Sequence, residues 1–489
     1  MSTNSAMLQE QEVTCVVTCR SSHNDADVVS SSAIFLTPPY VLAPGCLLGN
    51  ITADEVCDLR SASTATFEVT VAKADSSSMQ TIKAECISTW KCKKLMDVIN
   101  KLFSHDVQPY SSKTSSEDRF HVDLISTFLL LKLNSPLNDA LCLKDLKEMR
   151  ELSAASDLLV CSTPFGGSHV NSFYNSWTSG IVSKVIESGV AFLSDASCVP
   201  GGQGGLVYLK GSMAPAGVVL YPVVWRVDES TGLSLIGSIN VIIESLFNNI
   251  KGDLLDELTN SGLKTIDSQS VKDGSISSSS RIVRVRYGRS WGSGILLSDT
   301  YVLTCAHIFN GRSGSLSVEF QREKLSATIV FRSAAENRLD VAILKLTEKL
   351  DGIDILLSIP MIRVGVEVTA RGYGIFRHEP VVNVSSGIIA KCHSINSCAY
   401  TLVTTCKVHP GSSGGAITDK SGNILAMITS NTYDATNKIV YNDVSLGLSL
   451  EILYPSIVRL CCLDDLNGFK KLEEYLKGIT VSSLLHSKL

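Results

Sequence analysis

The two halves of this 489-residue chain repeat the same short motifs in the same order. ILLSDTYVLTCAH in the second half aligns without a gap with IFLTPPYVLAPGC in the first, and both contain Tyr-Val-Leu. In addition, LKL occurs in both halves, GIIAK matches GIVSK, and PGSSGG matches PGGQGG. One such match is weak, but four in a single order predict two copies of one fold.

Short apolar runs separated by Gly, Ser, Asn and Pro predict strands along most of the chain, for example in SATIVFRS, LDVAILKL and GNILAMITSN. Short strands at regular spacing are typical of β-barrels or β-sandwiches. SINVIIESLFNNIKGDLLDEL and LDDLNGFKKLEEYLKGI instead space their apolar residues like amphipathic helices. We therefore expect an all-β-dominated protein in which each half ends in a short helix.

The domain organisation follows from length and composition. A chain of 489 residues is too long for one ordinary core. Residues 265–280 carry a run of serines and almost no large apolar side chain, which predicts a linker. We expect a first domain at 11–264, the linker at 265–280, a second domain at 281–462, and a helix with a C-terminal tail at 463–489.

Composition and charge exclude several classes of function. The chain is 44% hydrophobic and 19% charged, which is typical of a globular protein. A net charge of -5 without a long basic run gives no electrostatic signature for nucleic acid. No stretch approaches the ~18 uncharged apolar residues of a membrane span. The polar N-terminus is unlike a secretory signal, so we expect a soluble protein made in the cytosol.

The 15 cysteines do not predict a disulfide framework, because their number is odd and the chain is long. Several lie inside apolar runs, such as Cys161 and Cys305, which favours buried free thiols. Cys15 and Cys19 could form half of a metal site, but no second pair has zinc-like spacing. We expect no metal and no cofactor.

The second half contains the groups that acyl transfer requires. A serine hydroxyl needs an imidazole as base, a carboxylate to orient that base, and N–H groups to bind the oxyanion. His307 follows a predicted strand, Asp340 opens another, and Ser413 lies in GSSGG. Glycines allow the tight turn that directs the N–H groups of Gly411 and Ser413 to one oxygen. These residues are candidates for base, orienting acid, nucleophile and oxyanion hole.

The order TxAH, Asp and GxSGG over residues 281–456 resembles the trypsin-like, chymotrypsin-fold serine proteases. The distances of 33 residues from His307 to Asp340 and 73 from Asp340 to Ser413 suit that family. The resemblance implies a double β-barrel and a substrate-pairing edge strand, for which the chain offers Met427, Ile428, Thr429 and Ser430.

The chain departs from the secreted members of this family in two places. Ser412 stands where they carry an Asp before the nucleophile, so activation by a freed N-terminus is not expected. Arg281-Ile282-Val283 is then interpreted as part of an ordinary first strand. Lys407 lies six residues before the nucleophile and supports no acidic specificity pocket. The preferred cleavage site therefore stays open.

The repeat places Cys46, Thr127 and Gln203 at the triad positions of the first half. The distance from Thr127 to Gln203 is 76 residues, close to its counterpart of 73, whereas 81 residues separate Cys46 from Thr127. The excess implies an insertion around residues 105–118. None of the three side chains can perform its triad role, and Cys46 has no matching base. We interpret the first half as a degenerate, non-catalytic copy.

The chain ends in Ser487, Lys488 and Leu489, which form a type 1 peroxisomal targeting signal. With the degenerate half, the Ser-rich linker and TTCKVHPGSSGG, this resembles a family of peroxisomal leader-peptide-processing proteases. The resemblance implies removal of leader peptides, trimming of fatty-acid β-oxidation enzymes, and self-cleavage. It also implies a location in the peroxisome matrix, protein substrates and an import receptor as partners. The oligomeric state stays open, a homo-oligomer included.

Two other readings of the second half stay open at this point. A peptide-binding pseudo-protease scaffold is disfavoured by the complete triad. A general quality-control protease of the HtrA kind would tolerate the absence of an Asp before Ser413. Such enzymes usually carry a peptide-binding module after the protease, and only about thirty residues follow it here.

Overall fold

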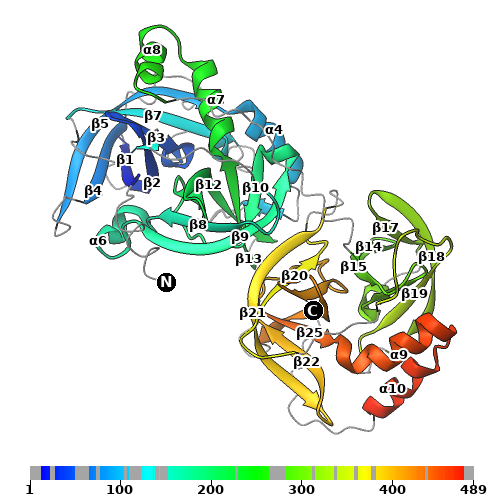
Figure 1. Cartoon of the computed structure of the whole chain (residues 1–489). Coiled ribbons are helices and arrows are strands. Elements are labelled where there is room, and N and C mark those ends of the chain that lie inside the picture. The colour runs from blue at the N-terminus through cyan, green and yellow to red at the C-terminus, as the bar shows by residue number, and fades with distance from the viewer. Residues whose placement is uncertain are drawn as a thin grey trace. The chain divides into compact units, whose positions relative to one another are not determined.

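The computed structural model of the chain describes residues 13–21, 28–49, 65–72, 78–103, 107–109, 123–135, 137, 142–143, 152–225, 229–263, 281–310, 314–334, 339–356, 362–375, 381–434 and 439–477. The predicted linker at 265–280 lies outside the described residues, as do Ser487, Lys488 and Leu489. Of the predicted insertion at 105–118, only residues 107–109 are described. The chain divides into two compact units, Met1–Gly274 and Ser275–Leu489, and each is described by itself (Figure 1).

Each unit contains two antiparallel six-stranded barrels. All four barrels share one strand order, in which the first three strands are followed by the sixth, the fifth and the fourth. Closure gives every strand a neighbour on both sides over at least part of its length. This architecture confirms the predicted pair of tandem double β-barrels.

The first barrel of the first unit closes around a core that includes Val17, Phe35 and Leu131. Its strands alternate buried and exposed residues where one face meets solvent, as in β4, and are buried throughout where both faces are covered, as in β3. In barrel order, the strands are β1 (Thr14–Ser21), β2 (Val28–Thr37), β3 (Tyr40–Pro44), β7 (Thr127–Leu133), β5 (Met79–Lys91) and β4 (Ala65–Ala72).

The second barrel of this unit has an additional short strand, β6 (Val107–Pro109), which pairs with β12. Its core includes Val160, Phe192 and Ile236. In barrel order, the strands are β8 (Asp157–Ser162), β9 (Ser176–Ile186), β10 (Ala191–Ser194), β13 (Glu229–Ser238), β12 (Ala214–Trp225) and β11 (Leu206–Leu209).

The two barrels of the second unit lack such an additional strand among their described residues. In order, the first consists of β14 (Ile282–Tyr287), β15 (Ser290–Leu296), β16 (Tyr301–Thr304), β19 (Ala342–Leu346), β18 (Glu323–Arg332) and β17 (Leu316–Phe320). The second consists of β20 (Glu367–Gly372), β21 (Asn383–Ile395), β22 (Cys398–Thr404), β25 (Ile439–Ser449), β24 (Ile424–Asp434) and β23 (Ala416–Asp419).

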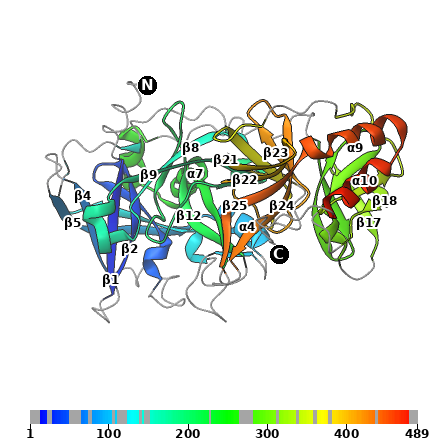
Figure 2. The same cartoon turned by 90° about the horizontal axis from the view of Figure 1, so that it is seen from below.

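Helices follow the last strand of each unit, as expected. The C-terminal pair, α9 and α10, packs on the barrels of the second unit (Figure 2): α9 contacts β22 and β24, and Phe469 of α10 contacts Phe331 of β18. Leu453, Ile457 and Phe469 are buried in a core that both barrels share. The α-helices are α4 (Lys93–Leu102), α6 (Val170–Phe173), α7 (Ile239–Asn249), α8 (Asp253–Asn260), α9 (Leu450–Leu463) and α10 (Asn467–Lys477). The 3₁₀ turns are η1 (Gly45–Leu48), η3 (Gly166–His169), η4 (Glu187–Gly189) and η5 (Ala306–Phe309).

The repeat extends to the contact that anchors these helices. In the second unit, the hydroxyl of Tyr301 donates to Asp464 at the end of α9, and the ammonium of Lys345 lies 5.3 Å from the Tyr301 ring centroid. In the first unit, the same pattern joins Tyr40, Glu257 and Lys132, with a Tyr40–Glu257 hydrogen bond of 2.6 Å and a cation–ring distance of 5.2 Å. Each unit thus ties a helix that follows its last strand to its own third strand, β3 or β16.

Two further features concern the described residues only. All 14 cysteines among them are free thiols. None of their helices combines the length and apolar character needed to cross a bilayer.

Candidate active site

The first barrel of the second unit brings His307 and Asp340 together. Strand β16 ends at Thr304, which pairs with Ala342 near the start of the antiparallel strand β19. The residues that follow β16 and those that precede β19 therefore lie side by side at one end of the barrel. Here η5 carries His307, and Asp340 lies two residues before β19.

Asp340 binds His307 through both of its carboxylate oxygens. Its Oδ2 lies 2.6 Å from His307 Nδ1, and its Oδ1 accepts the backbone N–H of His307 at 2.9 Å. Burial acts to raise the pKa of Asp340, but the hydrogen bonds from His307 and from the backbone of Ala306 outweigh it and hold that pKa below its usual value. An ionised Asp340 keeps the proton on Nδ1, so Nε2 is left with its lone pair.

Three backbone hydrogen bonds shape the loop that carries Ser413 between β22 and β23. Ser412 N–H donates to His409 O at 2.8 Å, Gly414 N–H to Ile428 O at 2.8 Å, and Gly415 N–H to Ser412 O at 2.9 Å. Gly411 adopts φ +95°, in the left-handed region that glycine tolerates best. An added Cβ there would lie 2.4 Å from Trp291 Nε1, so the loop requires glycine at this position.

These bonds leave two donors of the loop available. The backbone N–H groups of Gly411 and Ser413 form no hydrogen bond within the described part of the chain. Donors of this kind, held in place before a ligand arrives, can stabilise an oxyanion. The Ser413 hydroxyl itself donates to Thr429 O at 3.2 Å, and no described contact joins it to His307.

Residues 292–427 match the family model of the trypsin-like peptidase domain. This match lies entirely in the second unit, Ser275–Leu489, which is called the peptidase domain from here on. The match begins at Gly292 on β15 and ends at Met427 on β24, so it includes the segments that carry His307, Asp340 and Ser413.

The chain as a whole has named relatives. The chain is 30% identical over 342 residues to the peroxisomal leader peptide-processing protease of Homo sapiens, and 27% identical over 338 residues to that of Mus musculus. Each match covers 66% of this chain and 59% of the relative, so the matched part spans about three fifths of those proteins. A solved serine endoprotease from Yersinia pestis is 24% identical and covers 38% of this chain and 64% of its own, with a TM-score of 0.30.

Ser293 is a residue of the peptidase domain that the sequence did not reveal. Its N–H donates to Ser413 O at 2.7 Å, and its hydroxyl donates to Gly411 O at 2.8 Å while accepting the N–H of Tyr373 at 2.8 Å. One residue of the first barrel therefore binds both Gly411 and Ser413, the first through its side chain and the second through its backbone. The repeat contained a signal for it, because Ser32 occupies the matching place before the aligned isoleucine.

Cys305 is a second such residue of the peptidase domain. Its buried thiol donates to Ile428 O at 3.3 Å, next to the residue that accepts the Ser413 hydroxyl. Burial raises the pKa of Cys305 well above its usual value, and the Asp340 carboxylate adds to that effect. The thiol is therefore a neutral donor that links the histidine segment to β24.

Ligand atoms of Cys305, His307 and Asp340 lie within 4.8 Å of one another, which is close enough for a metal site. Each of these atoms already has a hydrogen-bond partner, however. The thiol binds Ile428 O, and the ring of His307 binds the Asp340 carboxylate. The hydrogen bonds of a protease triad therefore account for the whole group.

The predicted substrate-pairing residues fall into two pairs. Met427 and Ile428 are buried, and their strand segment already contacts β23 and the nucleophile loop. Thr429 and Ser430 are partly exposed, and Ser430 pairs with Leu446 of β25. The partly exposed end of the predicted pairing segment thus begins at Thr429.

The first unit repeats the scaffold of the peptidase domain with different side chains. Its loop forms the equivalent hydrogen bonds from Gly202, Gly204 and Gly205, at 2.8–3.1 Å. At the position of the nucleophile, Gln203 turns its Oε1 back to accept the N–H of Gly201 at 2.7 Å. The donor that is available at Gly411 is therefore occupied in the first unit.

The other two triad positions of the first unit are equally unsuited to catalysis. Thr127 donates its hydroxyl to Asp123 O at 2.7 Å, within its own turn. Burial raises the pKa of Cys46 to about 12, so its sulfur remains a thiol at neutral pH. No described carboxylate or imidazole stands beside them as a hydrogen-bond partner.

Proposed function

We propose that this chain is a peroxisomal serine endopeptidase that processes imported proteins. The observation that carries the proposal is the ionised Asp340–His307 pair in the same domain as a nucleophile loop with two available N–H groups. The names of the relatives supply the proposed cellular setting.

In the proposed reaction, the Ser413 hydroxyl leaves Thr429 O and turns toward His307 Nε2. Nε2 takes the proton as Ser413 Oγ bonds to the scissile carbonyl carbon, and Asp340 stabilises the imidazolium. The oxyanion receives the N–H groups of Gly411 and Ser413. His307 then protonates the leaving amine, and water hydrolyses the acyl-enzyme by the same steps in reverse order.

Peptidase activity toward an unfolded protein tests this mechanism. Ser413→Ala and His307→Ala should each remove nearly all turnover, because the members of a triad act as a unit. Both variants should keep the thermal stability of the wild type. Turnover at the wild-type rate in Ser413→Ala would refute the assignment.

The parts of the chain have different proposed roles, with the domain boundaries that the sequence predicts. Residues 281–462 carry catalysis, residues 11–264 form a non-catalytic copy, and residues 463–489 end in the address Ser487, Lys488 and Leu489. Deleting Leu489 should leave a fluorescently tagged protein in the cytosol, because the receptor reads the terminal carboxylate. Unchanged peroxisomal fluorescence would contradict this address.

The proposed substrates are imported proteins with N-terminal leader peptides, including enzymes of fatty-acid β-oxidation, and the chain itself. The supports are the names of the relatives and the peptide-binding edge at Thr429. For self-cleavage, we propose cuts near residues 105–118 or 265–280. Purified active protein should release fragments ending there, whereas Ser413→Ala should not, as intact-mass measurement can determine. Equal fragments from both proteins would contradict self-cleavage.

A further inference from the structure

Strand β12 of the first unit has an additional neighbour, whereas no described strand occupies the matching place on β24 of the peptidase domain. β11 pairs with β12 over Ala214–Val218, and β13 pairs with its other side as far as Trp225. Beyond the end of β11, the strand would be open, but β6 pairs with Val223, Val224 and Trp225. β6 belongs to the insertion that distinguishes the first half from the second.

This edge corresponds to the one that we assign to substrate in the peptidase domain. Gly204 N–H donates to Val219 O, and Val219 N–H donates to Gly205 O, at 2.8 and 2.9 Å. In the second unit, Ile428 exchanges the same two bonds with Gly414 and Gly415, at 2.8 and 2.7 Å. Val219 therefore matches Ile428, and Val223–Trp225, which pair with β6, match Thr432–Asp434 further along β24.

The direction of β6 also suits a bound peptide. The pairing is antiparallel, with Val107 opposite Trp225 and Pro109 opposite Val223. A chain that continues past Pro109 in this direction moves along β12 toward Val219 and the loop of Gln203. An antiparallel substrate on β24 would likewise move toward Thr429, whose carbonyl contacts Ser413.

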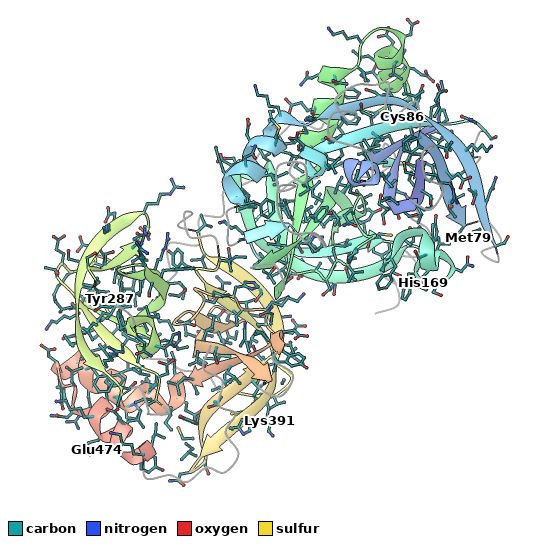
Figure 3. All side chains as sticks on the ribbon, turned by 180° about the vertical axis from the view of Figure 1, so that it is seen from behind. Met79, Cys86, His169, Tyr287, Lys391 and Glu474 are labelled. Atoms are coloured by element: carbon teal, nitrogen blue, oxygen red, sulfur yellow. The ribbon has the colours of Figure 1, made fainter. Side chains whose placement is uncertain are left out.

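An exposed apolar rim lies at this loop in the first unit. Phe165, Phe173 and Val199 are 49%, 37% and 37% exposed, and the rings of Phe165 and Phe173 are 5.4 Å apart. The N–H of Phe165 donates to Pro200 O at 2.8 Å, which ties the rim to the loop. Figure 3 shows His169, which contacts both rings, at the outer surface of the unit.

The peptidase domain has no such rim at the matching positions. The hydrogen bonds of the two loops match Val199 with His409, which is 6% exposed. Thr163 N–H donates to Ser32 as Tyr373 N–H donates to the equivalent Ser293. Phe165 and Ile375 each lie two residues after these donors, so they match, and Ile375 is fully buried. At these two positions, the side chain is thus exposed in the copy that cannot cut and buried in the copy that carries the triad.

We propose that the β12 edge of the first unit is a second peptide-binding site of the chain. It takes an extended polypeptide by strand addition, with apolar or aromatic residues after the paired segment, and β6 closes it in this structure. Gln203 occupies the N–H of Gly201, so a peptide that binds here is held without being cut. The site is independent of the proposed catalysis in the second unit.

Hydrogen exchange of the full chain carrying Ser413→Ala tests the proposal without cleavage. In a second form of this chain, a Gly-Ser segment of equal length replaces residues 104–121. The probe is a synthetic peptide with the sequence of residues 104–112, SHDVQPYSS. Its matched control carries proline in place of Val107 and Gln108. Because N–H groups alternate between the two sides of a strand, this change removes whichever donor faces β12.

We expect the replacement to speed exchange of those amides of Val223–Trp225 that face β6 by about tenfold or more, since they lose their partner strand. Excess probe should restore their protection in the replaced chain, and the proline peptide should not. In the chain that keeps β6, the probe should change nothing below ~1 mM, the effective concentration of a tethered strand.

Amides of Leu158–Cys161 in β8 monitor folding and should exchange equally in both chains. Unchanged exchange at Val223–Trp225 after the replacement would overturn the proposal. So would protection by the probe only at residues 429–433, which would place the sole peptide site in the peptidase domain. Equal protection by the two peptides would show that strand addition is not the mode of binding.

Discussion

The side-chain oxygen of Gln203 accepts the backbone N–H of Gly201 at 2.7 Å. The counterpart of Gly201 in the second unit is Gly411, whose N–H has no partner among the described residues. The two loops otherwise share their turn hydrogen bonds and their left-handed glycines, with φ +91° at Gly201 and +95° at Gly411. One hydrogen bond therefore separates a loop that can receive an oxyanion from one that cannot.

The first half should be silent in catalysis. We expect Cys46→Ser and Gln203→Ala to leave kcat/KM within about twofold of the wild type. Both residues belong to the first unit, whereas the proposed triad lies in the second. Steady-state hydrolysis of an unfolded protein measures this. A loss of tenfold or more in a variant of native thermal stability would contradict the proposed roles of the two halves.

Gly411→Ala should damage catalysis through the oxyanion loop. The new Cβ would meet Trp291 Nε1 and Tyr373 O at 2.4 and 2.5 Å, so the N–H must move away from the oxyanion position. Losing one such donor typically lowers kcat about 10²–10³-fold.

Gly422→Ala is the matched control for this change. Gly422 has a similar φ of +84°, but an added Cβ would meet nothing within 4 Å. It should cost about 1 kcal/mol of stability through backbone strain and leave kcat unchanged. If both variants lower kcat equally, the oxyanion role of the Gly411 N–H is wrong.

Asp340→Asn should lower kcat by about 10⁴, because the amide no longer favours the tautomer with its proton on Nδ1. The same variant tests the pKa. Since folding lowers the pKa of Asp340, its ionised form stabilises the protein above the unfolded value near 3.9, and this stability is lost as pH falls through the lower folded pKa. Denaturant unfolding should therefore separate wild type from variant at pH 7 and bring them together near pH 2. A constant difference over that range would contradict the pKa direction.

His409 gives the peptidase domain a second acid sensitivity. Burial, aided by the charge of Lys407, lowers the pKa of His409 to about 4, below its ordinary value of 6.5. The unfolded chain thus binds this proton first, and stability should fall by roughly 3 kcal/mol as pH drops from 6.5 to 4. His409→Gln should flatten that part of the profile. The same pH profile in both proteins would contradict the assignment.

The sequence predicted the parts of the fold that depend on periodicity and repetition. The short apolar runs and the aligned Tyr-Val-Leu segments predicted tandem double barrels. They could do so because apolar periodicity and repeated motifs are visible in short stretches of sequence. α9 was not predicted, since Pro455 interrupts its apolar pattern and packing of Leu453 and Ile457 against the barrel overrides that signal. β6 is too short, at three residues, to show any period.

The sequence likewise predicted some residues of the candidate site and not others. His307, Asp340 and Ser413 could be proposed from motif order and spacing, because each lies in a short local pattern. Ser293 and Cys305 could not, since their roles are hydrogen bonds to Gly411 and Ile428, more than 100 positions away in the chain. Such contacts exist only after the barrels have closed.

Labelling of the full chain with a serine-directed fluorophosphonate tests the central claim, that Ser413 is an activated nucleophile, most directly. Intact mass and peptide mapping should find one adduct, on Ser413, that forms at neutral pH. The rate of labelling should fall steeply in Asp340→Asn, and Ser413→Ala should not be labelled. An unlabelled wild type, or an adduct that persists in Ser413→Ala, would contradict the account.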